Sequence, residues 1–164
     1  MLSQETKKAL SIFAKNVVQE SKNNLRDQKK NASYKLWKSI TYDLKVHKNS
    51  FSLDFLMEDY GHYQDKGVSG KLRKFDTPFS YKSDAPPPSA FDKWIVAKGI
   101  APRNKGKFAS RKGLQRAISR KIFKYGIKPS LFFTKPFEKH FKNIPDEVVE
   151  SYGLDIETFL KFTL

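Results

Sequence analysis

The stretch DYGHYQDKGVSGK, residues 59–71, gathers side chains that could carry out proton transfer. His62 and Asp65 lie three positions apart, and a histidine with an orienting carboxylate is a common general base. A motif this short is weak evidence for catalysis, because such isolated pairs are frequent. We therefore favour a structural interpretation, in which His62 is a polar group of a turn that is hydrogen-bonded locally.

The same stretch predicts a structural corner at the root of a loop. Gly61 and Gly67 mark positions where the backbone needs a positive φ or a close approach to other atoms. Tyr60 and Tyr63 are expected to wedge the root of the loop into the core. Together with Asp65 they make up the predicted loop root: Tyr60, Gly61, Tyr63, Asp65 and Gly67.

The rest of the sequence offers no catalytic or metal-binding signature. The three histidines are widely spaced, and none belongs to an H-x-x-x-H or H-E-x-x-H pattern. The chain has no phosphate-loop or nucleophile-elbow motif, and no cluster of carboxylates suits a two-metal nuclease. It also has no cysteine, which excludes disulfides and thiolate catalysis. We expect a protein that is not an enzyme and has no catalytic residue, metal site or cofactor.

A basic helix expected at residues 111–125 is more informative. Four cations recur every fourth residue along one face: Lys112, Arg116, Arg120 and Lys124. Phe123 falls on the same polar side, and five apolar residues share the other: Leu114, Ala117, Ile118, Ile122 and Tyr125. Like charges at this spacing destabilise a helix unless an anion faces them. The row and Phe123 are therefore candidates for contact with a protein partner or with DNA, although a solvated basic face is the simpler alternative.

The net charge of +15 is concentrated in the middle of the chain. Residues 66–128 carry 17 Lys or Arg and 3 Asp or Glu, a net +14. Such a field favours an anionic partner: nucleic acid, an acidic protein surface or a membrane. No apolar run approaches the roughly 18 residues that span a bilayer, and the N-terminal segment is amphipathic rather than a signal peptide. We expect a soluble, unprocessed protein without a membrane partner.

The hydrophobic pattern predicts an α+β fold in a single domain, residues 1–164. An amphipathic N-terminal helix is expected from a cap at Ser3 to near Lys30. Period-two alternation then predicts an antiparallel hairpin at 40–57, to which a neighbouring strand is added.

The second half of the chain is expected to combine loops with two to four helices. A long loop at about 68–88 is followed by a short helix, with Ser89 and Asp92 in a capping arrangement and Gly99 as its stop. A polar loop at 100–110 precedes the basic helix, and the last third is expected to break near Pro145. Both loops are predicted to be disordered in the free protein and to become ordered on assembly.

The order of these motifs resembles a family of tailed-bacteriophage proteins. MEDYGHYQDKGVSG, FDKWIVAKGI and RKGLQRAISRKIFKYGIKPSLFFTKPFEKHF, followed by an acidic and apolar terminal helix, are similar to the head–tail joining, tail-completion or minor tail proteins. The resemblance covers nearly the whole chain. Its most specific parts are Tyr60-Gly61-x-x-x-Asp65-x-Gly67 and Gly126-Ile127-x-Pro129-x-x-Phe132-Phe133.

The resemblance implies a structural component of the virion, made in the bacterial host cytoplasm. It implies a homo-oligomeric ring of about six or twelve copies at the neck, the interface between head and tail. Such a ring joins the portal or its adaptor to the tail and lets the genome pass. The sequence departs from the family at residues 68–110, where many relatives are much shorter, so no role is transferred to that region.

Two functions therefore remain open. The leading hypothesis is the neck ring, with the basic row facing an acidic neighbouring subunit rather than making non-specific contact with DNA in the channel. The alternative is a basic nucleic-acid-binding protein that contacts phosphates through the 111–125 helix.

Overall fold

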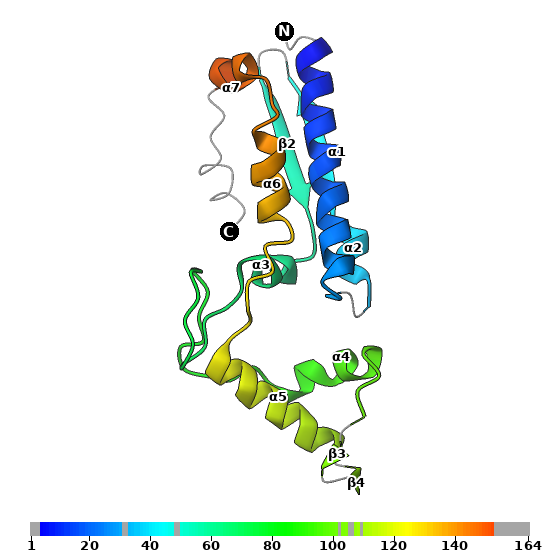
Figure 1. The fold of residues 1–164 in the computed structure, drawn as a ribbon, viewed down its shortest axis with the longest axis vertical. Coiled ribbons are helices and arrows are strands. Elements are labelled where there is room, and N and C mark those ends of the chain that lie inside the picture. Colours follow the sequence, from blue (N-terminus) through cyan, green and yellow to red (C-terminus); the bar gives the residue numbers. More distant parts are fainter. Residues whose placement is uncertain are drawn as a thin grey trace. The chain divides into compact units, whose positions relative to one another are not determined.

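The computed structural model places the chain in two compact units (Figure 1). Unit 1 comprises residues 1–65 and 131–164, and unit 2 comprises residues 66–130. The described residues are 4–30, 33–47, 50–101, 103–104, 107–108 and 110–152. They confirm the predicted α+β class. The single domain stays a prediction, because two compact units can belong to one domain.

Unit 1 begins with helix α1, Gln4–Asp27, which confirms the predicted amphipathic helix. Ser3, the predicted cap, lies outside the described residues. One face of α1 is buried along its length: Leu10, Phe13, Ala14, Val17, Ser21 and Leu25. The helix ends earlier than expected, and Lys29 just beyond it has a φ of 54°. A left-handed residue is a common way to end a helix.

A two-stranded antiparallel sheet follows α1. Strands β1, Thr41–Val46, and β2, Phe51–Leu56, form the predicted hairpin, in which Leu44 pairs with Leu53. The prediction of a neighbouring strand was wrong for the described part of the chain, where this sheet has two strands. A short helix, α2, Lys35–Ser39, precedes β1 and was not predicted.

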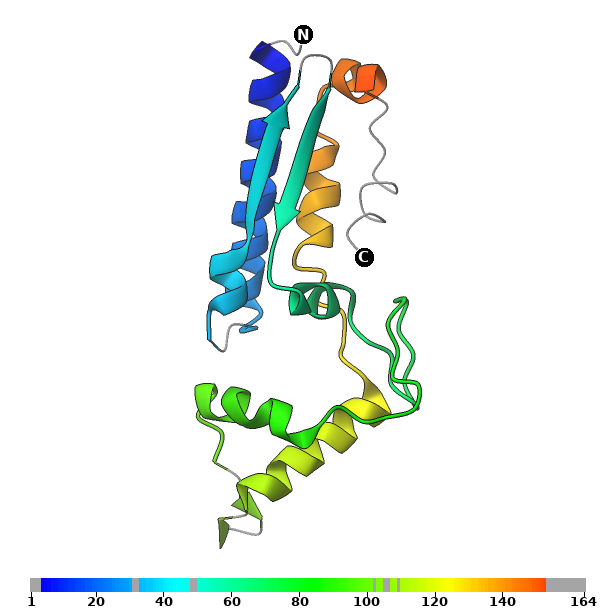
Figure 2. The same cartoon turned by 180° about the vertical axis from the view of Figure 1, so that it is seen from behind.

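Helix α6, Thr134–Phe141, packs beside α1 on one side of the hairpin. Figure 2, seen from behind, shows both strands in front of these two helices. The core between them is built on aromatic rings, such as the edge-to-face pair of Phe13 and Phe137, whose centroids are 5.3 Å apart. Helix α7, Asp146–Tyr152, follows after a break near Pro145, as predicted.

Unit 2 is built around helix α5, Arg111–Tyr125, which has the predicted boundaries. The Ser110 hydroxyl accepts a hydrogen bond of 3.0 Å from the backbone N–H of Gly113, and Gly126 ends the helix with a φ of 71°. Two short strands precede α5 and were not predicted: β3, Arg103–Asn104, and β4, Lys107–Phe108. Residues 68–87 contain isolated bridges but no helix, as the predicted loop requires.

The predicted short helix before the second loop is present in two parts, the 3₁₀ turn η1, Pro88–Phe91, and α4, Asp92–Ala97. Gly99 stops it with a φ of 61°, as expected. The predicted capping arrangement was wrong, because Asp92 is used elsewhere. Its carboxylate lies 2.6 Å from Nε of Arg111, so it connects α4 to the start of α5.

Candidate anion-binding surface

The predicted corner at residues 59–71 is partly helical. Helix α3, Tyr60–Lys66, replaces the expected turn. Residues four apart share a face of a helix, so Gly61 and Asp65 both lie on the buried side. The prediction that Tyr60 and Tyr63 wedge into the core was wrong: they are 45% and 46% exposed.

Asp65 is a buried structural residue rather than part of a catalytic pair. Its Oδ1 accepts hydrogen bonds from the backbone N–H of Phe133 at 2.8 Å and of Thr134 at 3.2 Å. Its Oδ2 accepts one from the Thr134 hydroxyl at 2.5 Å. Asp65 thus caps the start of α6 from a distant part of unit 1. Its backbone carbonyl also accepts a 3.0 Å bond from the N–H of Leu131.

The two glycines of the predicted loop root allow close contacts within each unit. In unit 1, a Cβ on Gly61 would lie 2.6 Å from Sδ of Met57. In unit 2, Gly67 has a φ of 75°, and a Cβ there would lie 2.6 Å from the carbonyl oxygen of Ile127. Other atoms therefore approach both glycines too closely for a Cβ, as the sequence interpretation expected.

The loop after Gly67 is fixed to the C-terminal end of α5. The backbone N–H groups of Lys71 and Leu72 donate to the carbonyls of Phe123 and Lys124, at 2.9 and 2.8 Å. These bonds satisfy carbonyls that the end of a helix leaves without partners. Because of them, the basic residues at the start of the loop lie beside the last turn of α5.

All four cations of the predicted row are exposed. Nine residues of α5 are exposed in total, and six of them are Lys or Arg: Arg111, Lys112, Arg116, Arg120, Lys121 and Lys124. Within the described chain, none of the four row residues has an ion pair. The row is therefore open to an anionic partner.

The opposite face of α5 differs from the prediction. Ala117 and Tyr125 are exposed, and the most buried residue of the helix is Ser119, whose hydroxyl donates to the carbonyl of Pro86 at 2.5 Å. The covered side of α5 is thus the side that is hydrogen-bonded to the loop. The positions of the apolar residues along the helix do not predict this side.

Phe123 is half-buried and packs against its own loop. Its ring centroid lies 6.4 Å from that of Tyr81, and Nζ of Lys71 lies 5.7 Å from it. Burial raises the pKa of Tyr81 above its ordinary value of 10.0. Phe123 therefore positions the loop, so its prediction as a partner-facing residue is not supported by its contacts. Sequence reasoning had not connected Lys71 or Tyr81 with α5.

The charges divide unevenly between the units. Unit 2 contains 17 Lys or Arg against 3 Asp or Glu, a net charge of +14. One of its three acids, Asp92, is already paired with Arg111. Nearly all of the excess positive charge therefore belongs to the unit that presents the α5 row.

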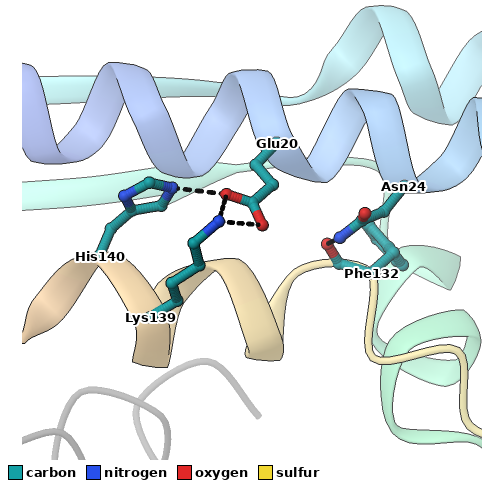
Figure 3. A network of polar contacts seen from close by, with 5 residues as sticks. All are labelled: Glu20, Asn24, Phe132, Lys139 and His140. Carbon is teal, nitrogen blue, oxygen red and sulfur yellow. Dashed lines mark hydrogen bonds and ion pairs between the residues drawn. The ribbon is translucent and has the colours of Figure 1, made fainter.

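Unit 1 contains a polar network between α1 and α6 (Figure 3). Glu20 on α1 lies 2.9 Å from Nζ of Lys139 and 2.7 Å from Nε2 of His140. The hydrogen bond from Lys139 is the main cause that lowers the pKa of Glu20 from its ordinary value of 4.5; burial opposes it, and His140 adds to the lowering. Asn24 also donates to the carbonyl of Phe132 at 3.3 Å. These contacts join α6 and the residue before it to α1.

In the part of the chain that the structure describes, no helix is long and apolar enough to cross a membrane, and no group of three or more acidic or histidine side chains could hold a metal ion. Comparison with protein-family models, with curated proteins and with solved structures found no match.

Proposed function

We propose that the chain is a structural, non-enzymatic subunit of a ring at the neck of a tailed phage. The ring would join the portal or its adaptor to the tail and surround the path of the genome. The proposal begins from the resemblance of the two motifs that include Asp65 and Gly126 to head–tail joining and tail-completion proteins.

The observation that carries the proposal is that residues of the first motif contact residues of the second. Asp65 of the first motif caps α6 directly after Phe132 and Phe133 of the second. Gly67 of the first motif packs against Ile127 of the second. Residues 60 and 68 positions apart thus contact one another, as expected of motifs that define a framework rather than an active site.

A ring needs two different surfaces on each subunit, because closed rings use heterologous contacts. The loops at 68–88 and 100–110 are the candidates for these contacts. Both loops belong to unit 2 and lie within residues 68–110, where the sequence departs from the family.

Mass measurement of the purified protein tests this proposal. We expect a closed oligomer of about six or twelve copies, formed alone or on addition of purified phage heads or tails. Native mass spectrometry gives the copy number, and electron microscopy shows whether the oligomer is a closed ring. A protein that stays monomeric under all of these conditions would contradict the proposal.

A further inference from the structure

Six exposed cations of unit 2 lie on α5 and on the loop that is hydrogen-bonded to its last turn, and we call this set the α5–loop surface. It consists of the α5 row and the basic residues of the attached loop: Lys112, Arg116, Arg120, Lys124, Arg73 and Lys82. All of them are exposed. Lys71 holds the loop ends together, since its Nζ donates to the carbonyl of Lys82 and lies over the ring of Phe123. The loop cations are thus held in defined positions beside the last turn of α5.

The stability of the unit does not explain this arrangement. Cations near the C-terminal end of a helix interact favourably with its dipole, which accounts for Lys124. The same dipole disfavours Arg111 and Lys112 in the first turn, where α5 has no acidic residue. Arg111 is compensated by Asp92, but Lys112 has no ion pair among the described residues. Lys112 at the start of the row therefore interacts unfavourably with the helix dipole, and neighbouring cations repel one another along the row.

The chemistry of the surface fits a polyanion better than an acidic protein. The cores of protein interfaces are enriched in aromatic residues and depleted of charge. On α5 six of the nine exposed residues are cations, and the large hydrophobic side chains exposed beside them are Tyr125 and Leu72 of the attached loop, so cations dominate this surface.

The dimensions of the row also suit a nucleic acid backbone. From Lys112 to Lys124 the helix rises about 18 Å, at 1.5 Å per residue. Over that length duplex DNA presents about ten phosphate charges, one per about 1.7 Å of its axis. The phosphate charge of a duplex over this length therefore exceeds the four positive charges of the row.

We propose that the α5–loop surface binds the phosphate backbone of nucleic acid without sequence preference. Side chains aimed at phosphates fix position but do not read bases. This inference stands apart from the neck proposal, because a monomer can bind DNA and a ring can form without it. The two proposals can therefore fail separately.

Fluorescence polarisation with two duplexes of unrelated sequence, each of about 30 base pairs, tests the proposal. We expect affinities for the two that agree within about twofold, because phosphate contacts carry no base information. Four phosphate contacts give a log–log salt slope of about −3.6, which is a loss of about 150-fold in affinity between about 50 and 200 mM salt.

A matched pair of variants locates the binding surface. The row variant K112Q/R116Q/R120Q/K124Q and the control K8Q/K15Q/K30Q/K38Q each remove four positive charges, and the control lysines are exposed residues of unit 1. We expect the row variant to lose at least about a hundredfold in affinity at low salt and most of the salt slope, and the control to lose only a few fold. Equal losses in both variants would overturn the proposal, because net charge alone would then explain binding.

Two further measurements complete the test. Circular dichroism checks that the row variant remains folded; if it does not, the pairs K112Q/R116Q and R120Q/K124Q replace it, each with an expected loss of at least about tenfold. Poly-L-glutamate serves as a probe for acidic protein partners. If it displaces the duplex at equal charge concentration, or if the protein binds no duplex at low salt, the proposal is overturned.

Discussion

The carboxylate of Asp65 accepts a hydrogen bond of 2.8 Å from the backbone N–H of Phe133, a residue 68 positions further along the chain. Helix α6 therefore takes its N-terminal cap from another segment of unit 1 rather than from its own flanking residues. The carboxylate of Asp65 thus joins two segments that are far apart in the sequence.

Replacement of Asp65 by alanine should destabilise the protein by about 2–3 kcal/mol, because it removes the cap of α6 and leaves the buried hydroxyl of Thr134 unsatisfied. Urea unfolding measures the change. His62→Ala is the control and should cost less than about 0.5 kcal/mol, since the Asp65 carboxylate is hydrogen-bonded to Phe133 and Thr134 rather than to His62. Similar effects of the two substitutions would contradict the role given to Asp65.

The ion pairs of Glu20 should stabilise unit 1 only above acidic pH. Its pKa in the folded protein is lower than the ordinary value of 4.5, so its contribution is present above 4.5 and is lost as the pH falls through the folded-state pKa. We expect Glu20→Gln to cost up to about 1 kcal/mol near neutral pH and close to nothing at about pH 3.

Unfolding of this variant and the wild type across the pH range gives the comparison. Glu138→Gln, at an exposed position of α6 without an ion pair in the described residues, is the control and should show little change. A difference for Glu20→Gln that is the same at both ends of the pH range would rule out the ionic explanation.

Gly126→Ala should be far more damaging than Gly99→Ala, although both positions have positive φ. A Cβ on Gly126 would lie 2.1 Å from the carbonyl oxygen of Val68, whereas one on Gly99 would have no atom within 4 Å. We expect about 1 kcal/mol for Gly99→Ala from backbone strain and at least about 3 kcal/mol for Gly126→Ala. Thermal unfolding measures the loss of stability in both variants. The difference between the two losses gives the cost of the clash, because backbone strain is common to both.

Neutralisation of the basic row should stabilise the protein. The row variant K112Q/R116Q/R120Q/K124Q removes three like-charge pairs at i, i+4 spacing, each destabilising by about 0.2–0.5 kcal/mol. We expect a gain of about 1 kcal/mol at low salt that disappears at about 1 M salt, where charges are screened. A loss of stability at low salt would show that the row contributes to folding and would remove one reason to assign it a partner.

Hydrogen exchange should divide the 68–88 loop into two parts in the free protein. The sequence predicted disorder throughout, yet the N–H groups of Val68, Ser69 and Tyr81 donate to backbone carbonyls within unit 2. We expect protection at these positions and fast exchange at the exposed residues 82–85. Uniformly fast exchange from 68 to 88 would instead support the predicted disorder of the whole loop.

The sequence was most informative where local signals decide the structure. Helix α5 was predicted from about Arg111 to Tyr125, and the structure places its ends there. The signals that fix these ends, the cap by Ser110 and the stop at Gly126, are adjacent to the helix. The hairpin was predicted because strict alternation identifies a strand with one buried face.

The failures share a different cause, which is contact between distant segments. Helix α3 was missed because Gly61 looks like a turn residue, whereas the structure uses it for close packing against Met57. The role of Asp65 depends on a partner 68 positions away, and the covered side of α5 depends on the hydrogen bond from Ser119 to Pro86. For the candidate surface, the row was predictable from spacing, but the loop cations were not, because hydrogen bonds to the end of α5 place them there.

The 3.0 Å hydrogen bond from the N–H of Leu131 to the carbonyl of Asp65 joins the two points where the chain leaves unit 1 and returns to it. Residues 66–130 thus form an insertion in the sequence of unit 1, and the two ends of this insertion lie close together. A linker of a few residues is long enough to close the gap after their excision. The basic unit can therefore be removed or replaced as a block without a change in the chain path of unit 1.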